Sequence, residues 1–89
     1  MEPTTADRPA RADGLEVNDV SDGLVLYQQD PERVHYLNNT ASLVFELCDG
    51  RRSPDEIATL LREAFTLERL PIEEVASCID ELRGQGVIR

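Results

Sequence analysis

The apolar pattern of the chain changes its period within residues 33–47, which read RVHYLNNTASLVFEL. Residues 33–37 predict a β-strand, in which side chains alternate between the two faces and place His35 and Leu37 on the same side. Residues 38–40, Asn-Asn-Thr, offer three candidate helix N-caps. Apolar side chains then recur at helical spacing, at Leu43, Val44 and Leu47. The stretch therefore predicts a strand that leads directly into a helix.

Two further strands are predicted before this stretch. Leu15 and Val17 alternate with polar residues, and residues 24–27 read LVLY. Ser-Asp-Gly at 21–23 and Gln-Asp-Pro-Glu at 29–32 are turn sequences, because glycine supplies a positive φ and proline presets a negative one. The three strands are therefore expected to form an antiparallel meander.

Two further helices are predicted after Gly50, a residue type that commonly ends a helix. Residues 53–56 read Ser-Pro-Asp-Glu, a capping box with proline in the first helical position. The apolar residues that follow at spacings of three and four are Ile57, Leu60, Leu61, Ala64 and Phe65. A third helix is predicted from Pro71 to the glycines at 84 and 86. Its inner face would consist of Ile72, Val75, Ala76, Ile79 and Leu82.

These elements predict an α+β fold that is winged helix-turn-helix-like, with a three-stranded antiparallel sheet followed by three α-helices. Residues 1–13 contain two prolines and alternating charges without apolar periodicity, so we expect a disordered N-terminal tail there. The domain is expected to span residues 14–89. A chain of 89 residues with 40% apolar residues is sufficient for one small core and too short for two domains.

The charge of the chain argues against nucleic acid and membrane partners. All 9 basic residues are arginines, and 18 acidic residues give a net charge of -9. In the predicted third helix, which a winged helix commonly places in the DNA major groove, four carboxylates oppose Arg83 alone. No apolar run reaches the roughly 18 residues of a membrane span, and the N-terminus lacks the pattern of a secretion signal. We therefore expect a cytoplasmic protein that binds neither nucleic acid nor membrane.

The residue types that usually carry catalysis are scarce. His35 is the sole histidine, and a structural role within its strand is the simpler interpretation. Cys48 and Cys78 have no neighbouring base in the sequence and no CxxC spacing, so we expect free thiols, with a single disulfide as the alternative. A zinc site needs about four ligands of these types. The sequence thus indicates no catalytic residues, no metal and no cofactor.

The last predicted strand offers a binding surface. An edge strand exposes unpaired N–H and C=O groups unless charge, proline or a cover protects it, and Arg33 is the only charged residue in 33–37. An extended peptide can add a strand to such an edge, and a second copy of the chain can pair there to give a homodimer. The edge residues are Val34, His35 and Tyr36, and the adjoining apolar wall would consist of Val75, Cys78, Ile79 and Leu82. The alternative is that these helical residues belong to the core.

Four short motifs give the chain a family resemblance. They are YLNNTA at 36–41, VFELCDGRRS at 44–53, EIA at 56–58 and ELRGQGVI at 81–88. In this order and spacing, the chain resembles the PqqD family over residues 15–89. The resemblance implies a standalone recognition element for a ribosomally synthesised, post-translationally modified peptide, built on a winged-helix fold.

In that family the leader segment of a precursor peptide lies as a strand against the third strand, in a cleft with the third helix. The resemblance therefore implies a non-catalytic chaperone that binds a leader peptide and delivers it to a modifying enzyme, for which we expect a radical S-adenosylmethionine enzyme. Transferred to this sequence, the contacts are the backbone of Val34, His35 and Tyr36 and the side chains of Val75, Cys78, Ile79 and Leu82. Two alternatives stay open, a structural or regulatory interaction subunit of the winged-helix type and a degenerate DNA-binding regulator.

Overall fold

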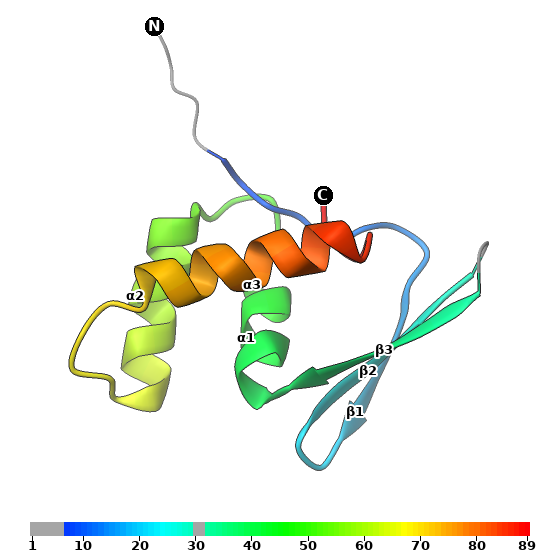
Figure 1. The fold of residues 1–89 in the computed structure, drawn as a ribbon, viewed down its shortest axis with the longest axis horizontal. Coiled ribbons are helices and arrows are strands. Elements are labelled where there is room, and N and C mark those ends of the chain that lie inside the picture. Colours follow the sequence, from blue (N-terminus) through cyan, green and yellow to red (C-terminus); the bar gives the residue numbers. More distant parts are fainter. Residues whose placement is uncertain (1–6, 30–31) are drawn as a thin grey trace, which may run out of the picture.

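The structure, a computed structural model, describes residues 7–29 and 32–89. Its elements are β1 (Glu16–Val20), β2 (Gly23–Gln28), β3 (Arg33–Asn38), α1 (Asn39–Leu47), α2 (Pro54–Phe65) and α3 (Ile72–Gly84). The strands form one antiparallel sheet in the order β1-β2-β3, and the helices pack beside it (Figure 1). The predicted α+β fold, a three-stranded antiparallel sheet followed by three helices, is confirmed. The likeness to a winged helix stays a prediction.

The sheet buries one face and exposes the other. Leu24 lies opposite Leu37 across β2 and β3, and both side chains are buried on the helix-covered face. Val25 lies opposite Tyr36 on the other face, where Tyr36 is 54% exposed. Gly23 begins β2 so close to the Leu37 carbonyl that a Cβ at this position would collide with it. The turn predicted at 29–32 includes Asp30 and Pro31, which lie outside the described residues.

The strand-to-helix transition predicted at the end of β3 is confirmed. Of the three candidate caps, Asn38 is the N-cap of α1, and its Oδ1 accepts a hydrogen bond from the Ala41 amide at 2.9 Å. One turn into the helix, the buried Ser42 hydroxyl donates to the Leu37 carbonyl at 3.0 Å. These two bonds fix the angle at which α1 leaves the sheet, so that no loop separates β3 from α1.

The capping box predicted for α2 is also present. The Ser53 hydroxyl accepts from the Glu56 amide at 3.2 Å, and the Ser53 amide donates to Glu56 Oε1 at 2.8 Å. At the other end of α2, Thr66 takes the left-handed conformation with φ 54°, which is uncommon for a β-branched residue. Helix α3 follows after a short loop and has no side-chain cap at its N-cap, Pro71.

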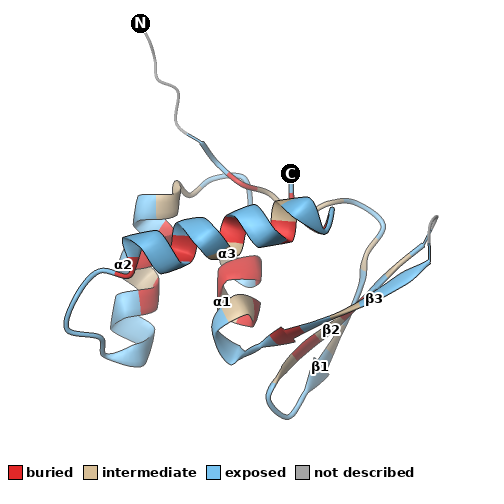
Figure 2. Cartoon of the chain, in the orientation of Figure 1, coloured by how far each residue is buried: buried red, intermediate tan, exposed pale blue. Residues whose placement is uncertain are grey.

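The core lies where the three helices meet each other and the inner face of the sheet (Figure 2). All three helices contribute buried side chains, and the last residues of the chain close the core from one end. The fully buried members from the helices and the C-terminal segment include Val44, Phe45, Cys48, Ile57, Ala58, Leu61, Val75, Ile79, Leu82, Val87 and Ile88. Because α3 sends three of these inward, its position relative to β3 is fixed by packing rather than by the loop before it.

Residues 7–12 do not form the disordered tail that the sequence predicted. The amide of Arg11 donates to the Cys48 carbonyl at 3.0 Å, and Ala10 and Arg89 exchange two backbone hydrogen bonds at 2.7 and 3.3 Å. Pro9 is fully buried. In Figure 1 this segment crosses the helical end of the molecule beside the C-terminus. The prediction was therefore wrong for these residues, and residues 1–6 of the predicted tail lie outside the described residues.

The reason for that error is the way the segment is held. Its contacts are mainly backbone hydrogen bonds to the α1–α2 loop and the C-terminal residues, and backbone bonds leave no apolar period in a sequence. Side chains of this segment also take part: the Arg11 guanidinium lies over the Phe45 ring at 5.8 Å from the ring centroid, and Asp7 pairs with Arg83. We call residues 7–12 the N-terminal arm.

Candidate functional site

Strand β3 is an edge of the sheet. Its inner side pairs with β2 along all six residues, and among the described residues no other strand pairs with its outer side. The N-terminal arm forms two isolated β-bridges, but they join it to Asp49 and Ile88 and not to β3. Since backbone groups of an edge strand point outward at alternate residues, β3 presents hydrogen-bonding groups to an incoming strand.

A cleft lies along this edge, between the end of β3, the first turn of α1 and the second half of α3. Its volume is about 200 Å³. The residues that line it are Tyr36, Leu37, Asn38, Ala41, Cys78, Glu81, Leu82 and Gln85. We call this hollow the β3–α3 cleft. A space of this size accommodates one large side chain or two small ones, and is smaller than the roughly 300–1,000 Å³ typical of sites for drug-sized ligands.

Three of the seven residues predicted for the site line this cleft, namely Tyr36, Cys78 and Leu82. Val75 and Ile79 are 1% and 2% exposed and belong to the core, so the prediction that they form a groove wall is wrong. Leu82 is only 2% exposed, so only a small part of its side chain reaches the cleft. The alternative stated from the sequence, that the apolar stripe of this helix packs into the core, therefore holds for Val75 and Ile79.

The face of α3 that lines the cleft lies beside the buried apolar face of the same helix. Cys78, Glu81 and Gln85 follow one another at spacings of three and four residues, which places them on one face of the helix. Sequence reasoning missed Glu81 and Gln85 because both are polar, whereas the predicted wall was apolar. The signal that would have found them is the helical spacing from Cys78 itself.

The two remaining predicted residues lie on β3 but outside the cleft lining. Val34 is 60% exposed on the outer face of the sheet. His35 is half-buried on the opposite face, with Nε2 at 3.0 Å from Gln28 Oε1 on β2. Neither residue therefore contributes to the lining of the cleft.

Tyr36 connects the cleft to the outer face of the sheet. Its hydroxyl donates to the Asp22 backbone carbonyl at 3.2 Å, in the turn between β1 and β2. Hydrogen bonding to Asp22 raises the pKa of the Tyr36 hydroxyl, so this side chain stays neutral at physiological pH. The bond ties the Tyr36 side chain to the turn between β1 and β2.

Both cysteines are free thiols, as predicted. Burial raises the pKa of Cys48 to about 11, with a smaller contribution from Cys78. Burial also raises the pKa of Cys78, followed by the negative charge of Glu81. Thiolates are the reactive form of cysteine. The raised pKa values therefore favour the thiol form of both residues at neutral pH, and neither is activated as a nucleophile.

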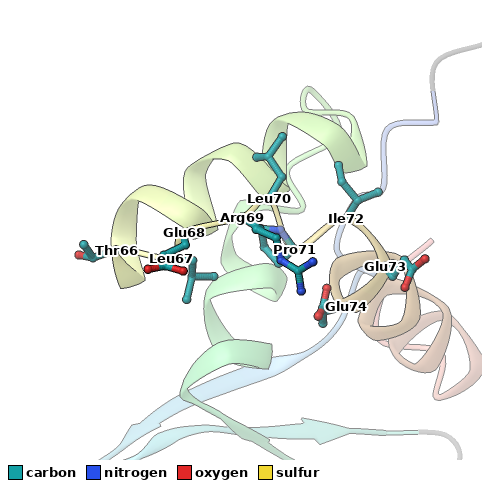
Figure 3. Close-up of a pocket in the computed structure, with 9 residues that line it drawn as sticks. All are labelled: Thr66, Leu67, Glu68, Arg69, Leu70, Pro71, Ile72, Glu73 and Glu74. Atoms are coloured by element: carbon teal, nitrogen blue, oxygen red, sulfur yellow. The ribbon is translucent and has the colours of Figure 1, made fainter.

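A larger hollow than the β3–α3 cleft lies away from β3. It has a volume of about 720 Å³ and is open to solvent along the loop between α2 and α3. Figure 3 shows that the nine residues lining it, from Thr66 to Glu74, come from one continuous segment. Leu67, Leu70 and Ile72 are each about 40% exposed there. Within residues 7–29 and 32–89, no group of three or more His, Cys, Asp or Glu residues is placed to hold a metal ion.

A family model described as coenzyme PQQ synthesis protein D (PqqD) matches residues 23–88. The chain belongs to the PqqD family. No curated protein and no solved structure matched the chain. The PqqD match begins at the first residue of β2 and includes every residue of the β3–α3 cleft, whereas β1 and the N-terminal arm lie before it.

Membership of the PqqD family confirms the resemblance that the four sequence motifs indicated. In the part of the chain that the structure describes, no helix is long and apolar enough to cross a membrane.

Proposed function

We propose that this chain is a non-catalytic chaperone that binds the leader segment of a ribosomally synthesised precursor peptide. The leader adds as a fourth strand to the outer side of β3, beside α3, and the bound peptide is delivered to a modifying enzyme of the radical S-adenosylmethionine class. The observation that carries the proposal is the position of the β3–α3 cleft against the last three residues of β3, a strand whose outer side no other described strand pairs with. Membership of the PqqD family, whose description names coenzyme synthesis, supports it.

The cleft is needed to account for a useful affinity. Four or five backbone hydrogen bonds contribute about 1 kcal/mol each, whereas micromolar affinity requires about 8 kcal/mol. Association also carries its own entropic cost. At least one leader side chain must therefore leave water on binding. The cleft, floored by the apolar Leu37, Ala41 and Leu82, is where such a side chain can be buried.

The proposed role needs no chemistry from the chain itself. Holding the leader keeps the rest of the precursor near the active site of the enzyme, so that the second encounter becomes intramolecular. The gain in the rate of modification then depends on the length of the peptide segment between the leader and the residue that reacts. This mechanism agrees with the raised pKa values of the two thiols, which leave neither of them as a nucleophile.

The experiment that tests strand addition is an N-methyl scan of a bound peptide. A displayed library of random peptides of about twelve residues, twice the six-residue length of β3, provides the ligand. Because alternate amides of an added strand face β3, N-methylation at every second residue should abolish binding, and N-methylation of the intervening residues should leave it nearly unchanged. A scan in which all positions behave alike would exclude strand addition.

A second candidate function is a structural or regulatory interaction subunit. The observation that favours it is the α2–α3 loop, where Leu67, Leu70 and Ile72 expose apolar surface that nothing in the described chain covers. The two functions are separable. Replacing Leu67 and Leu70 by serine should leave peptide binding unchanged in a peptide chaperone, and should remove partner binding in a subunit that docks through this loop.

A further inference from the structure

The β3–α3 cleft contains one charged side chain. Of the eight residues that line it, only Glu81 has a carboxyl or basic side chain, and this residue is exposed. Within the described ranges, none of the ion pairs includes Glu81. The carboxylate is therefore available to a ligand that enters the cleft.

The arginine nearest in sequence to Glu81 is engaged elsewhere. Arg83 is bound to Asp7 of the N-terminal arm, with nitrogen–oxygen distances of 2.6 and 3.0 Å, and also donates to the Arg89 carbonyl at 3.3 Å. These bonds hold the Arg83 guanidinium against the N-terminal arm. Arg83 therefore does not neutralise the charge of Glu81, although both residues lie on α3.

The charge of Glu81 acts on the interior of the cleft. It contributes to the raised pKa of Cys78, which lies one turn earlier on the same stripe of α3 and lines the cleft. Glu74 continues this stripe toward the N-terminus of the helix and is exposed as well. The whole chain carries a net charge of -9. Both the local and the overall field therefore attract cations and repel carboxylates.

A strand added to β3 would bring its side chains to this charge in a defined order. Its residues alternate between the outer face of the sheet and the side that faces α3, and successive residues on one side are about 6.5–7 Å apart. If one of them fills the apolar floor beside Leu82, the next residue on the same side is two positions along the peptide. A long basic side chain there reaches the rim where Glu81 lies.

We propose that Glu81 makes the β3–α3 cleft selective for leader segments that carry arginine or lysine two positions from an apolar anchor, on the same side of the bound strand. The inference rests on the proposed function, because it assumes that a peptide strand occupies the cleft. An acidic residue at the same position is disfavoured by repulsion from Glu81, so the sign of the charge, and not merely polarity, distinguishes ligands.

The test compares peptide selections on three proteins. A displayed library of random peptides of about twelve residues is selected on the wild-type chain, on Glu81→Gln and on Glu81→Arg. Glu63→Gln, an exposed position on α2, is the control with the same net charge as Glu81→Gln. We expect an apolar-x-basic pattern with the wild type and with Glu63→Gln, no charge preference with Glu81→Gln, and an apolar-x-acidic pattern with Glu81→Arg.

A matched peptide pair then measures the interaction itself. The best wild-type peptide is synthesised with its arginine and with the neutral isostere citrulline. For an exposed ion pair we expect citrulline to weaken binding to the wild type by about fivefold, and the loss should shrink as salt is raised. On Glu81→Gln the two peptides should bind equally, which assigns the difference to Glu81.

The outcomes separate this inference from the proposed function. Selected peptides that are sensitive to alternate N-methylation but show no basic preference would overturn the role of Glu81 and leave strand addition in place. Equal loss from citrulline on the wild type and on Glu81→Gln would overturn it in the same way. A library without enrichment, or peptides insensitive to N-methylation, would overturn both.

Discussion

Asp7 and Arg83, which are 76 positions apart in the sequence, form a bidentate ion pair. Arg83 Nη2 lies 2.6 Å from Asp7 Oδ1, and Arg83 Nη1 lies 3.0 Å from Asp7 Oδ2. The pair joins the first described residue of the chain to the last turn of α3. It therefore connects the N-terminal arm to the helix that forms one side of the β3–α3 cleft. The hydrogen bonds from Arg83 lower the pKa of the Asp7 carboxyl below its ordinary value of 3.8.

The first prediction concerns the pH dependence of this pair. Because the pKa of Asp7 is lowered by folding, the unfolded chain binds its proton first as the pH falls. The stabilisation is complete above the ordinary value of 3.8 and is lost as the pH falls through the lowered value. Asp7 is 48% exposed, so we expect Asp7→Asn to cost less than about 1 kcal/mol at pH 7. Urea unfolding of both proteins should show the difference in stability shrinking as the pH falls below 3.8.

The second prediction concerns the N-terminal arm as a whole. Removing residues 1–12 deletes the backbone bonds of Pro9 to Ala12 and uncovers the Cys48 and Val87 carbonyls that accept two of them. At about 1 kcal/mol per bond we expect a loss of roughly 3–5 kcal/mol, a large part of the stability of a small domain. A second deletion of residues 1–6 retains those bonds. The difference between the two unfolding free energies isolates the arm, and equal values would show that the arm contributes nothing.

The sequence predicted the element types well because each had a local physical cause. The capping box at Ser53 and the turn glycine at Gly23 are short-range signals, and both are present in the structure. The N-terminal arm was missed because its stability comes from partners more than 30 positions away, such as Cys48 and Arg89. Backbone pairing of that kind has no signature in the sequence of either partner.

The candidate site was predicted only in part, for a related reason. Leu82 belongs both to the buried stripe of α3 and to the lining of the cleft. The sequence identifies an apolar stripe on this helix, yet the rotation of α3 against the sheet depends on how its side chains pack with α1 and α2. A small rotation of α3 about its axis decides which residues line the cleft, and in this structure they are Glu81 and Gln85 and not Val75 and Ile79. The position of β3 at the edge of the sheet, in contrast, could be predicted from the sequence, because the last strand of a three-stranded meander is always an edge strand.

The third prediction separates the core from the cleft. Val75→Asp places a charge at a position that is 1% exposed, and we expect it to unfold the chain, since an unpaired buried charge costs several kcal/mol. Gln85→Trp adds bulk to an exposed position on the cleft and should change stability by less than about 0.5 kcal/mol. Circular dichroism melts distinguish the two variants.

Peptide affinity completes this comparison. We expect Gln85→Trp to weaken a selected peptide by about tenfold, because the indole occupies the mouth of the cleft. Gln29→Trp is the matched control, since it makes the same substitution at an exposed residue beside the other end of the sheet. If Gln85→Trp and Gln29→Trp bound the peptide equally well, the cleft would not be the binding site.

The fourth prediction uses the two thiols as reporters of the cleft. Cys78 is half-buried and lines the cleft, whereas Cys48 is fully buried. A maleimide should therefore modify Cys78 in the native protein and reach Cys48 only after unfolding. Burial and the charge of Glu81 raise the pKa of Cys78, so its rate should keep rising with pH beyond the ordinary value of 9.0. Mass spectrometry of digested protein identifies the modified residue.

Binding of a peptide should slow this reaction, and the reaction should in turn prevent binding. A strand along β3 that buries a side chain beside Leu82 covers the Cys78 sulfur, so we expect protection from alkylation that rises with peptide occupancy. A bulky maleimide already attached to Cys78 fills a space of about 200 Å³ and should weaken the peptide by at least tenfold. Cys78→Ala, which keeps the cleft open, should bind the peptide whether or not it has been exposed to the reagent. Full alkylation of Cys78 in a saturated complex would place the peptide elsewhere on the molecule.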